Sequence, residues 1–334
     1  MGEKADESRF FRIWSMEMQQ NLQIGPLRTR IYIDGYNLYY GCLRNTPYKW
    51  LDIVALFERC ILPSVLLRCE LGDALISSLS SAPSIKYFTA KIVERVARGS
   101  DSVSSQARYH TALRKLYTDN VQIIEGYFSV SKTIVKTVDD NYPNRAPREC
   151  HEMLVWKIEE KQSDVNISLE AYHDSLSGSI DQVVFVTNDT DIAPALKMIR
   201  EHSRVKVGLV IPTTDHERVP NTELANLAHW VRTHITKDEL ASSQLPRVIL
   251  GRKPTVKPES WYARPDLLHK ILALAIPVKG DKGRAFKWMG QPNPYLDNRC
   301  PIDLVETEEG AQQVIDYITL WLGTRASEIE LQPD

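Results

Sequence analysis

The chain has 334 residues, of which 43% are apolar and 25% are charged, and its formal net charge is −2. This composition is typical of a globular protein, and the length predicts about two domains. No apolar run reaches the roughly 18 residues of a membrane-spanning helix, and the N-terminus lacks a secretory signal, so we expect a cytoplasmic protein that contacts no membrane. The five cysteines include no CxxC pair, which argues against a disulfide framework.

Residues 1–28 are interpreted as an N-terminal extension that contains a short docking helix, because four apolar residues there lack a strand partner: Phe10, Phe11, Ile13 and Trp14. From 29 to 240, short apolar runs alternate with amphipathic segments. Strands are predicted at 30–33, 84–89, 121–130, 182–187 and 205–211. Helices are predicted at 51–60, 105–117 and 164–176, after Asp191, and around 224–231, with a long loop before Cys150. This alternation predicts an α/β fold with a mostly parallel sheet.

The last third of the chain changes character. Residues 241–262 carry three prolines and little periodicity, and they are predicted to be a linker that wraps an edge of the first domain. Residues 263–334 are predicted to be a small helical domain with a net charge of −3. Its helices are expected at 265–275, 284–289, 301–305 and 308–321.

Carboxylates follow two of the predicted strands. Asp34 ends the first strand before Gly35, with Asn37 three residues later, and Asp189 and Asp191 follow the strand at 182–187. Asp164 opens a helix. Ligands bind at the carboxyl ends of parallel strands, so these side chains are expected to converge. For each aspartate alone, a helix cap or a turn is the preferred interpretation, and Asp164 and Asp191 are predicted at helix caps.

A cluster of carboxylates is usually compensated by a hard divalent cation. We therefore predict a Mg²⁺ or Mn²⁺ site made by Asp34, Asp164, Asp189 and Asp191. Such a site would activate water for hydrolysis of a phosphodiester, with Asn37 as a further catalytic residue. The metal count stays open, as does the choice between RNA and DNA.

Candidate substrate-binding residues surround this cluster: Lys161, Thr187, Asn188, Arg98 and Arg108. Lys161 would contact a phosphate or pair with a neighbouring glutamate. Arg98 and Arg108 belong to a basic stretch, 86–115, that holds seven Lys and Arg residues. Such a stretch neutralises phosphates or forms a solvated helix face, and the charge pattern leaves both open.

Three motifs resemble the NYN domain family of PIN-like proteins: Asp34-Gly-Tyr-Asn37, Glu160-Lys-Gln-Ser-Asp164 and Thr187-Asn-Asp-Thr-Asp191. The resemblance covers roughly 29–262. It implies a PIN-like Rossmannoid sheet, a metal-dependent ribonuclease acting on single-stranded or structured RNA, and the metal ligands named above. Gln162-Ser163 departs from the glycine that related sequences often place after the lysine.

The segment Thr46–Asp52 resembles a bacterial subgroup of these domains in which some members are described as pyridine hydroxylases. The chain shows no flavin or nicotinamide fingerprint, so the ribonuclease is the preferred interpretation and the hydroxylase an alternative.

Residues 263–323 resemble the toxin-binding domain of the MbcA/ParS/Xre antitoxins. The resemblance is carried by 285–310, where Trp288 precedes a Pro-Asn-Pro turn and a further helix. It implies a protein partner for 263–334 and a role in toxin–antitoxin or phage-defence biology. The competing interpretations are a bundle that only covers the sheet, and a non-catalytic protein that binds RNA or a partner. The oligomeric state is also left open by the sequence, with a homo-oligomer as one alternative.

Overall fold

The computed structural model describes residues 25–68, 74–214 and 218–330. The chain forms two compact units. Unit 1 comprises Met1–Cys42, Asp52–Lys91 and Tyr117–Ser243, and unit 2 comprises Leu43–Leu51, Ile92–Leu116 and Gln244–Asp334. The docking helix predicted within residues 1–28 falls almost entirely outside the described residues.

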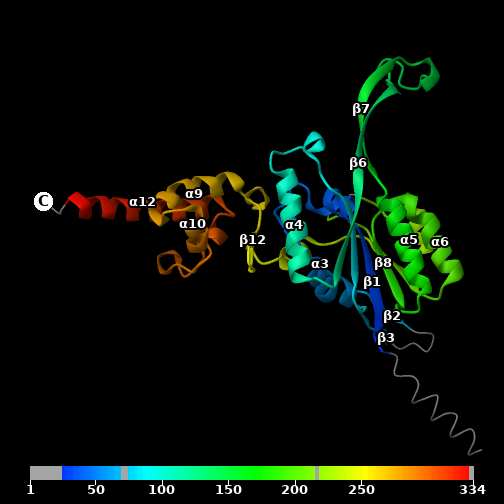
Figure 1. Ribbon diagram of the computed structural model, residues 1–334, viewed down its shortest axis with the longest axis horizontal. Helices are drawn as coiled ribbons and strands as arrows, with labels where there is room; N and C mark the ends of the chain where they lie inside the picture. The colour runs from blue at the N-terminus through cyan, green and yellow to red at the C-terminus, as the bar shows by residue number, and fades with distance from the viewer. Residues whose placement is uncertain (1–24, 69–73, 215–217, 331–334) are drawn as a thin grey trace, which may run out of the picture. The chain divides into compact units, whose positions relative to one another are not determined.

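Unit 1 is built on a sheet whose path runs β10-β9-β8-β1-β5-β6-β7, with β4 pairing with the start of β1 (Figure 1). All neighbours in this sheet are parallel except β6 and β7. The strands are β1 (Leu27–Asp34), β4 (Ser77–Leu79), β5 (Ile85–Ala90), β6 (Val121–Lys136), β7 (Glu152–Lys161), β8 (Gln182–Val186), β9 (Lys206–Val210) and β10 (Trp230–Arg232). A separate small ribbon pairs β2 (Leu67–Arg68) with β3 (Ala74–Leu75).

Helices flank this sheet, so the predicted α/β class is confirmed. Those of unit 1 are α2 (Gly35–Leu38), α3 (Ile53–Ala55), α5 (Ser163–Leu176), α6 (Ala193–His202), α7 (Thr222–Leu227) and α8 (Lys237–Ser242). Helices α5 and α6 lie side by side on one face (Figure 1). None of the helices in the described part of the chain is long and apolar enough to cross a membrane, and the cytoplasmic location stays a prediction.

The central strands are buried along most of their length. Every residue of β8 is buried, as expected for a strand inside a parallel sheet. On one face, the ring of Tyr32 stacks between Phe88 and Phe185, at centroid distances of 6.4 and 5.5 Å. These aromatic rings join β1 to both of its neighbours.

A buried ionic cluster attaches α5 to the sheet. Asp174 accepts a hydrogen bond from the Tyr32 hydroxyl at 2.7 Å and pairs with Arg30 at 3.1 Å and Lys86 at 2.6 Å. The three charged side chains are each less than a tenth exposed. Lys86 also pairs with Glu170 at 2.5 Å. Because Arg30 lies on β1 and Lys86 on β5, one carboxylate connects the helix to two strands.

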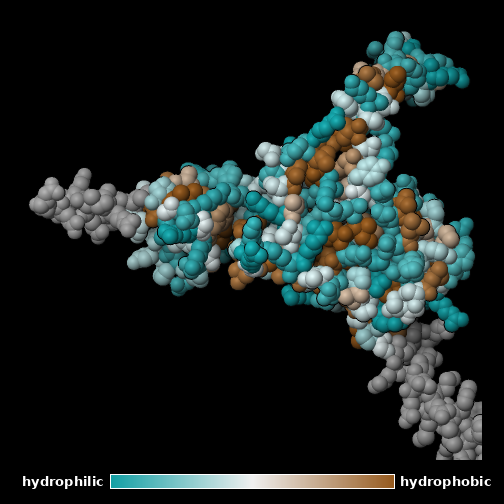
Figure 2. Space-filling model, in the orientation of Figure 1, coloured by the Kyte–Doolittle hydropathy of each residue, from teal (hydrophilic) through white to brown (hydrophobic). Residues whose placement is uncertain are grey.

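The long loop predicted before Cys150 is wrong in part. Strand β6 continues to Lys136, and β7 returns antiparallel to it. The apolar residues Leu154, Trp156 and Ile158 occur at every second position, which is a strand pattern. All three are at least half exposed, and Figure 2 shows hydrophobic residues along this hairpin. The hairpin is hard to predict because the apolar residues of its strands face solvent and pack against no buried core.

Unit 2 contains α4 (Ser102–Leu116), the ribbon of β11 (Val248–Ile249) and β12 (Thr255–Val256), and a C-terminal helical region. Lys115 Nζ donates to Thr255 Oγ1 at 2.8 Å, which joins α4 to the ribbon. The predicted helical region is confirmed. Its helices are α9 (Pro265–Lys279), α10 (Lys282–Met289), α11 (Pro301–Leu304) and α12 (Glu308–Glu330), around a core that extends from Leu267 to Ile318.

Replacing Asp174 by alanine is expected to lower the free energy of unfolding by about 3–5 kcal/mol, because Arg30 and Lys86 would lose their shared buried counter-charge. The matched control is Asp181→Ala, since Asp181 pairs with Arg28 at the surface, where the two side chains are 37% and 50% exposed. That change should cost about 1 kcal/mol or less. Urea denaturation of the full chain measures both, and equal losses would contradict the role assigned to the buried cluster.

Candidate functional site

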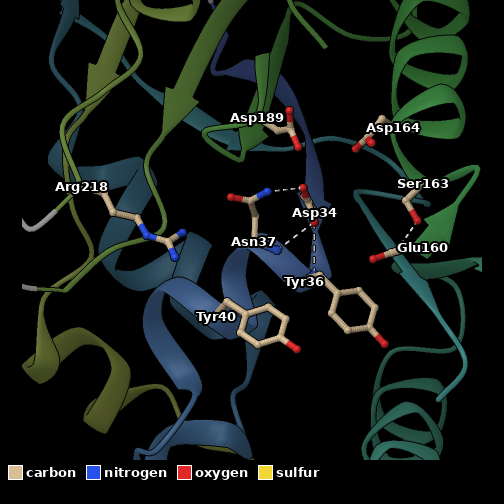
Figure 3. Close-up of a pocket in the computed structure, with 9 residues that line it drawn as sticks. All are labelled: Asp34, Tyr36, Asn37, Tyr40, Glu160, Ser163, Asp164, Asp189 and Arg218. Carbon is tan, nitrogen blue, oxygen red and sulfur yellow. Dashed lines mark hydrogen bonds between the residues drawn. The ribbon is translucent and has the colours of Figure 1, made fainter. Parts of the chain in front are cut away.

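A cavity of about 420 Å³ lies in unit 1 at the carboxyl ends of β1 and β8 (Figure 3). In the sheet, β1 pairs with β5 on one side and with β8, which comes later in the chain, on the other. The strand order therefore reverses at β1, and the cavity lies at this point. Open α/β sheets bind ligands at such a point. The cavity is lined by Asp34, Tyr36, Asn37, Tyr40, Glu160, Ser163, Asp164, Asp189 and Arg218.

Asp34 is held in one position by four hydrogen bonds. Its Oδ1 accepts from the backbone N–H groups of Tyr36 and Asn37 at 3.1 and 2.9 Å, and its Oδ2 accepts from Asn37 Nδ2 and Thr187 Oγ1 at 2.8 and 3.2 Å. Burial raises the pKa of Asp34, although these hydrogen bonds act in the opposite direction. A Cβ at Gly35 would lie 2.7 Å from the Phe88 carbonyl oxygen, so this turn requires glycine.

Asp189 occupies the turn after β8. Its backbone N–H donates to Thr187 Oγ1 and its Oδ1 accepts from the N–H of Asp191, each at 3.1 Å. The prediction that Asp191 caps the next helix is wrong: Asp189 caps a short 3₁₀ turn over Thr190–Ile192, and α6 begins at Ala193. Asp191 is exposed and lies outside the lining of the cavity.

The end of β7 and the start of α5 supply two carboxyl groups with unusual acidity. Burial, and then the negative charges of Asp34 and its neighbours, raise the pKa of Glu160 to about 7 and that of Asp164 to about 6. The Glu160 carboxylate accepts a hydrogen bond from the Ser163 hydroxyl, which partly offsets this increase. Both groups therefore titrate near neutral pH.

Aromatic rings and one cation complete the lining. Tyr36 and Tyr40 lie four residues apart with their rings stacked at 6.2 Å, and Phe128 meets Tyr36 edge-on at 5.6 Å. Figure 3 shows Arg218 across the cavity from Glu160 and Asp164.

Sequence reasoning named four of the nine lining residues as site residues and missed Tyr36, Tyr40, Glu160, Ser163 and Arg218. The first four of these lie within or next to the Asp34–Asn37 and Glu160–Asp164 motifs, so their position in the sequence could have identified them as candidate site residues. Arg218 follows β9 in a loop that has no motif, and nothing in the sequence points to it.

The other predicted substrate-binding residues are distributed more widely. Lys161 pairs with Glu159 at 3.1 Å, and Thr187 is buried beneath Asp34. Arg98 and Arg108 belong to unit 2, where Arg108 lines a separate hollow of about 430 Å³. None of these four lines the cavity at Asp34, and their roles stay predictions.

Comparison with known proteins identifies a close relative. The chain is 61% identical over 305 residues to the 6-hydroxy-3-succinoylpyridine 3-monooxygenase HspA of Pseudomonas putida (strain DSM 28022 / S16), a match that covers 91% of this chain and 98% of the relative. A solved structure, the protein of unknown function VPA0982 from Vibrio parahaemolyticus RIMD 2210633, matches 64% of this chain and 95% of its own at 15% identity. Its TM-score of 0.35 supports no statement about the fold.

The C-terminal resemblance is confirmed. Residues 273–320 match the Antitoxin Xre/MbcA/ParS C-terminal toxin-binding domain. The Antitoxin Xre of Yersinia enterocolitica (serotype O:8 / biotype 1B, strain NCTC 13174 / 8081) is 51% identical over 39 residues, which are 12% of this chain and 26% of that protein.

The predicted NYN ribonuclease is wrong, because the relative that matches almost the whole chain is a monooxygenase. The hydrolytic activity, the Mg²⁺ or Mn²⁺ cofactor and the RNA substrate are wrong with it. Among residues 25–68, 74–214 and 218–330, no group of three or more His, Cys, Asp or Glu side chains is arranged to hold a metal ion. Carboxylates at strand ends occur in many α/β sites, so three short motifs could not distinguish between reactions. By its identity along nearly all of both chains, this protein belongs to the family of the 6-hydroxy-3-succinoylpyridine 3-monooxygenase HspA.

Proposed function

We propose that this protein is a monooxygenase that attaches one oxygen atom to a ring carbon of 6-hydroxy-3-succinoylpyridine or a closely similar carboxylated hydroxypyridine. The observation that carries the proposal is the 61% identity to a relative that bears this activity in its name, over 98% of that relative's length. The cavity at Asp34 is the proposed substrate site, since its volume of about 420 Å³ is in the range of small-molecule sites.

The lining suits a hydroxypyridine. In its lactam form, such a ring presents an N–H donor beside a carbonyl acceptor. An ionised carboxylate accepts from the N–H, and a protonated carboxyl group donates to the carbonyl. Glu160 and Asp164, whose pKa values are about 7 and about 6, supply both forms near neutral pH. Tyr36 and Tyr40 offer ring faces for the aromatic substrate.

Asp164, the more acidic of the two carboxyl groups, is the proposed proton acceptor, and Glu160 is the group that keeps its proton. A base that removes the proton of the hydroxypyridine increases electron density at C3, the para carbon, which is the carbon that the relative's name gives for oxygenation. C3 bears the succinoyl group, so the new C–O bond replaces the bond between C3 and the acyl carbon. With O₂ and two electrons from the donor, one oxygen atom joins the ring and the other leaves as water, and the acyl group takes up water and leaves as a dicarboxylic acid. A general base works best when its pKa is near the working pH. Asp34 is occupied by four hydrogen bonds, so we assign it the positioning of Asn37 rather than proton transfer.

Monooxygenation uses O₂ and two electrons from a donor. The cavity does not fit the pyrophosphate of a flavin or nicotinamide dinucleotide, which normally accepts hydrogen bonds from the first helix after β1. Here the N–H groups of Tyr36 and Asn37 already donate to Asp34. Three further carboxyl groups line the cavity and would repel phosphate. We therefore assign the cavity to the substrate and derive no step through a dinucleotide bound there.

We also propose that residues 263–334 form a module that binds a protein partner, because 273–320 match a toxin-binding domain. Tyr295, which is 80% exposed and stacks on Tyr317 at 5.7 Å, is a candidate contact residue. To test this, the full chain and its Tyr295→Ser variant are each used for affinity purification. If a partner binds at this surface, less of it should be recovered with the variant than with wild type.

Incubation with 6-hydroxy-3-succinoylpyridine, isotope-labelled O₂ and a reduced nicotinamide or reduced flavin is expected to give a dihydroxypyridine that has lost the succinoyl group and carries one labelled oxygen. Mass spectrometry of the product measures this. The double variant Glu160→Gln/Asp164→Asn should lower kcat by about 100-fold or more, because the proton acceptor and the carboxyl group that donates to the ring carbonyl are both removed. Lack of labelled product with every donor, from well-folded wild type, would refute the proposed function.

The rate is also expected to depend on pH. Because Glu160 must keep its proton, kcat/KM should fall above about pH 7. Because Asp164 must lose its proton, kcat/KM should rise with pH through a transition near pH 6. The charge of Asp191 raises the pKa of Asp164, so Asp191→Asn should move this transition to lower pH without abolishing turnover. Asp181→Asn, which changes an acidic residue paired with Arg28, is the control and should leave the profile unchanged. An identical profile for all three proteins would argue against Asp164 as the base.

A further inference from the structure

We propose that Arg218 binds the carboxylate of the substrate's side chain and so determines which way the ring faces, and that Asn188 positions Arg218. The inference rests on the proposed function and adds a specificity-determining residue to the same site. It assigns the cavity two chemically distinct ends, a cationic end for the acid tail and a carboxyl end for the hydroxypyridine ring.

The charges that line the cavity are separated in space. Arg218 is the one Lys or Arg among the lining residues, whereas four lining residues are acidic. Figure 3 shows the guanidinium on one side and Glu160 and Asp164 on the other, with Asp34 and Asn37 between them. Within the described part of the chain, the Arg218 guanidinium makes no ion pair or hydrogen bond, so its donors are available to a ligand.

This separation permits one orientation for a substrate that carries a carboxylate. Placed beside Glu160 or Asp164, the carboxylate would meet like charge at a partly buried site. Placed beside Arg218, it can receive two parallel N–H···O hydrogen bonds, the geometry in which a guanidinium recognises a carboxylate best. The ring then extends past Tyr36 and Tyr40 toward the carboxyl groups.

Asn188 connects the segment around Arg218 to the sheet. Its Nδ2 donates to the Val219 carbonyl oxygen at 3.1 Å, and its Oδ1 accepts from the Asn221 N–H at 2.9 Å. Asn188 lies two residues beyond the end of β8 and does not line the cavity. It therefore acts through Arg218, as a positioning residue, by fixing the backbone next to the guanidinium.

The test compares two ligands, the acid 6-hydroxy-3-succinoylpyridine and its neutral primary amide, on full-length wild type, Arg218→Gln, Arg218→Lys and Asn188→Ala. Calorimetric Kd values and KM and kcat are measured for each. Arg218→Gln should weaken binding and raise KM for the acid by about 10- to 100-fold, with kcat changed only a few-fold, because a charge-assisted pair is lost. Binding of the amide should change little. The Kd of Arg218→Lys for the acid should lie between those of wild type and Arg218→Gln. Lysine keeps the positive charge but cannot donate two parallel hydrogen bonds to a carboxylate.

Asn188→Ala should lower the ratio of the amide Kd to the acid Kd. The decrease should be smaller than that caused by Arg218→Gln. A merely structural role would weaken both ligands equally, and that result would overturn the assignment of Asn188. Equal losses for acid and amide in Arg218→Gln would overturn the assignment of Arg218. The Kd values decide this even if wild type does not hydroxylate the acid, so the failure of the inference and the failure of the proposed function are distinguishable.

Discussion

The buried ion pairs of Asp174 are the interaction on which the arrangement of unit 1 depends. One carboxylate joins α5 to Arg30 on β1 and to Lys86 on β5. Helix α5 begins beside the cavity, with Ser163 and Asp164 in the lining, and β1 ends there at Asp34. A shift of α5 against the sheet would move these groups apart, yet removing one partner of a buried pair is costly. The interior charges therefore set the spacing of the carboxyl groups at the site.

That spacing explains the chemistry assigned to the site. Burial, and then repulsion between neighbouring carboxylates, raise the pKa of Glu160 to about 7 and that of Asp164 to about 6, so these groups hold protons near neutral pH. The same repulsion can be relieved by a divalent cation, and this was the basis of the incorrect ribonuclease prediction. Clustered carboxylates thus indicate a functional site but leave its reaction open. The relative at 61% identity separates the two alternatives, which the local motifs do not.

Local pattern was sufficient for most of the fold. The alternation of apolar strands and amphipathic helices predicted the parallel sheet. Of the four aspartates expected to converge, Asp34, Asp164 and Asp189 line one cavity and Asp191 does not. The β6–β7 hairpin was missed beyond residue 130, because its alternating apolar residues are exposed and enclose no core. Arg218 was missed because a loop residue carries no periodicity.

The sequence by itself determined the class of fold and the place of the site, since strand period, turn glycines and acidic strand ends are properties of neighbouring residues. Only the tertiary structure decided which groups face one another. Burial of Glu160 and Asp164, the hydrogen bond from Thr187 to Asp34 and the position of Arg218 across the cavity all depend on segments far apart in the chain. Acidity and ligand orientation follow from desolvation and distance, and neither quantity exists until those segments pack together.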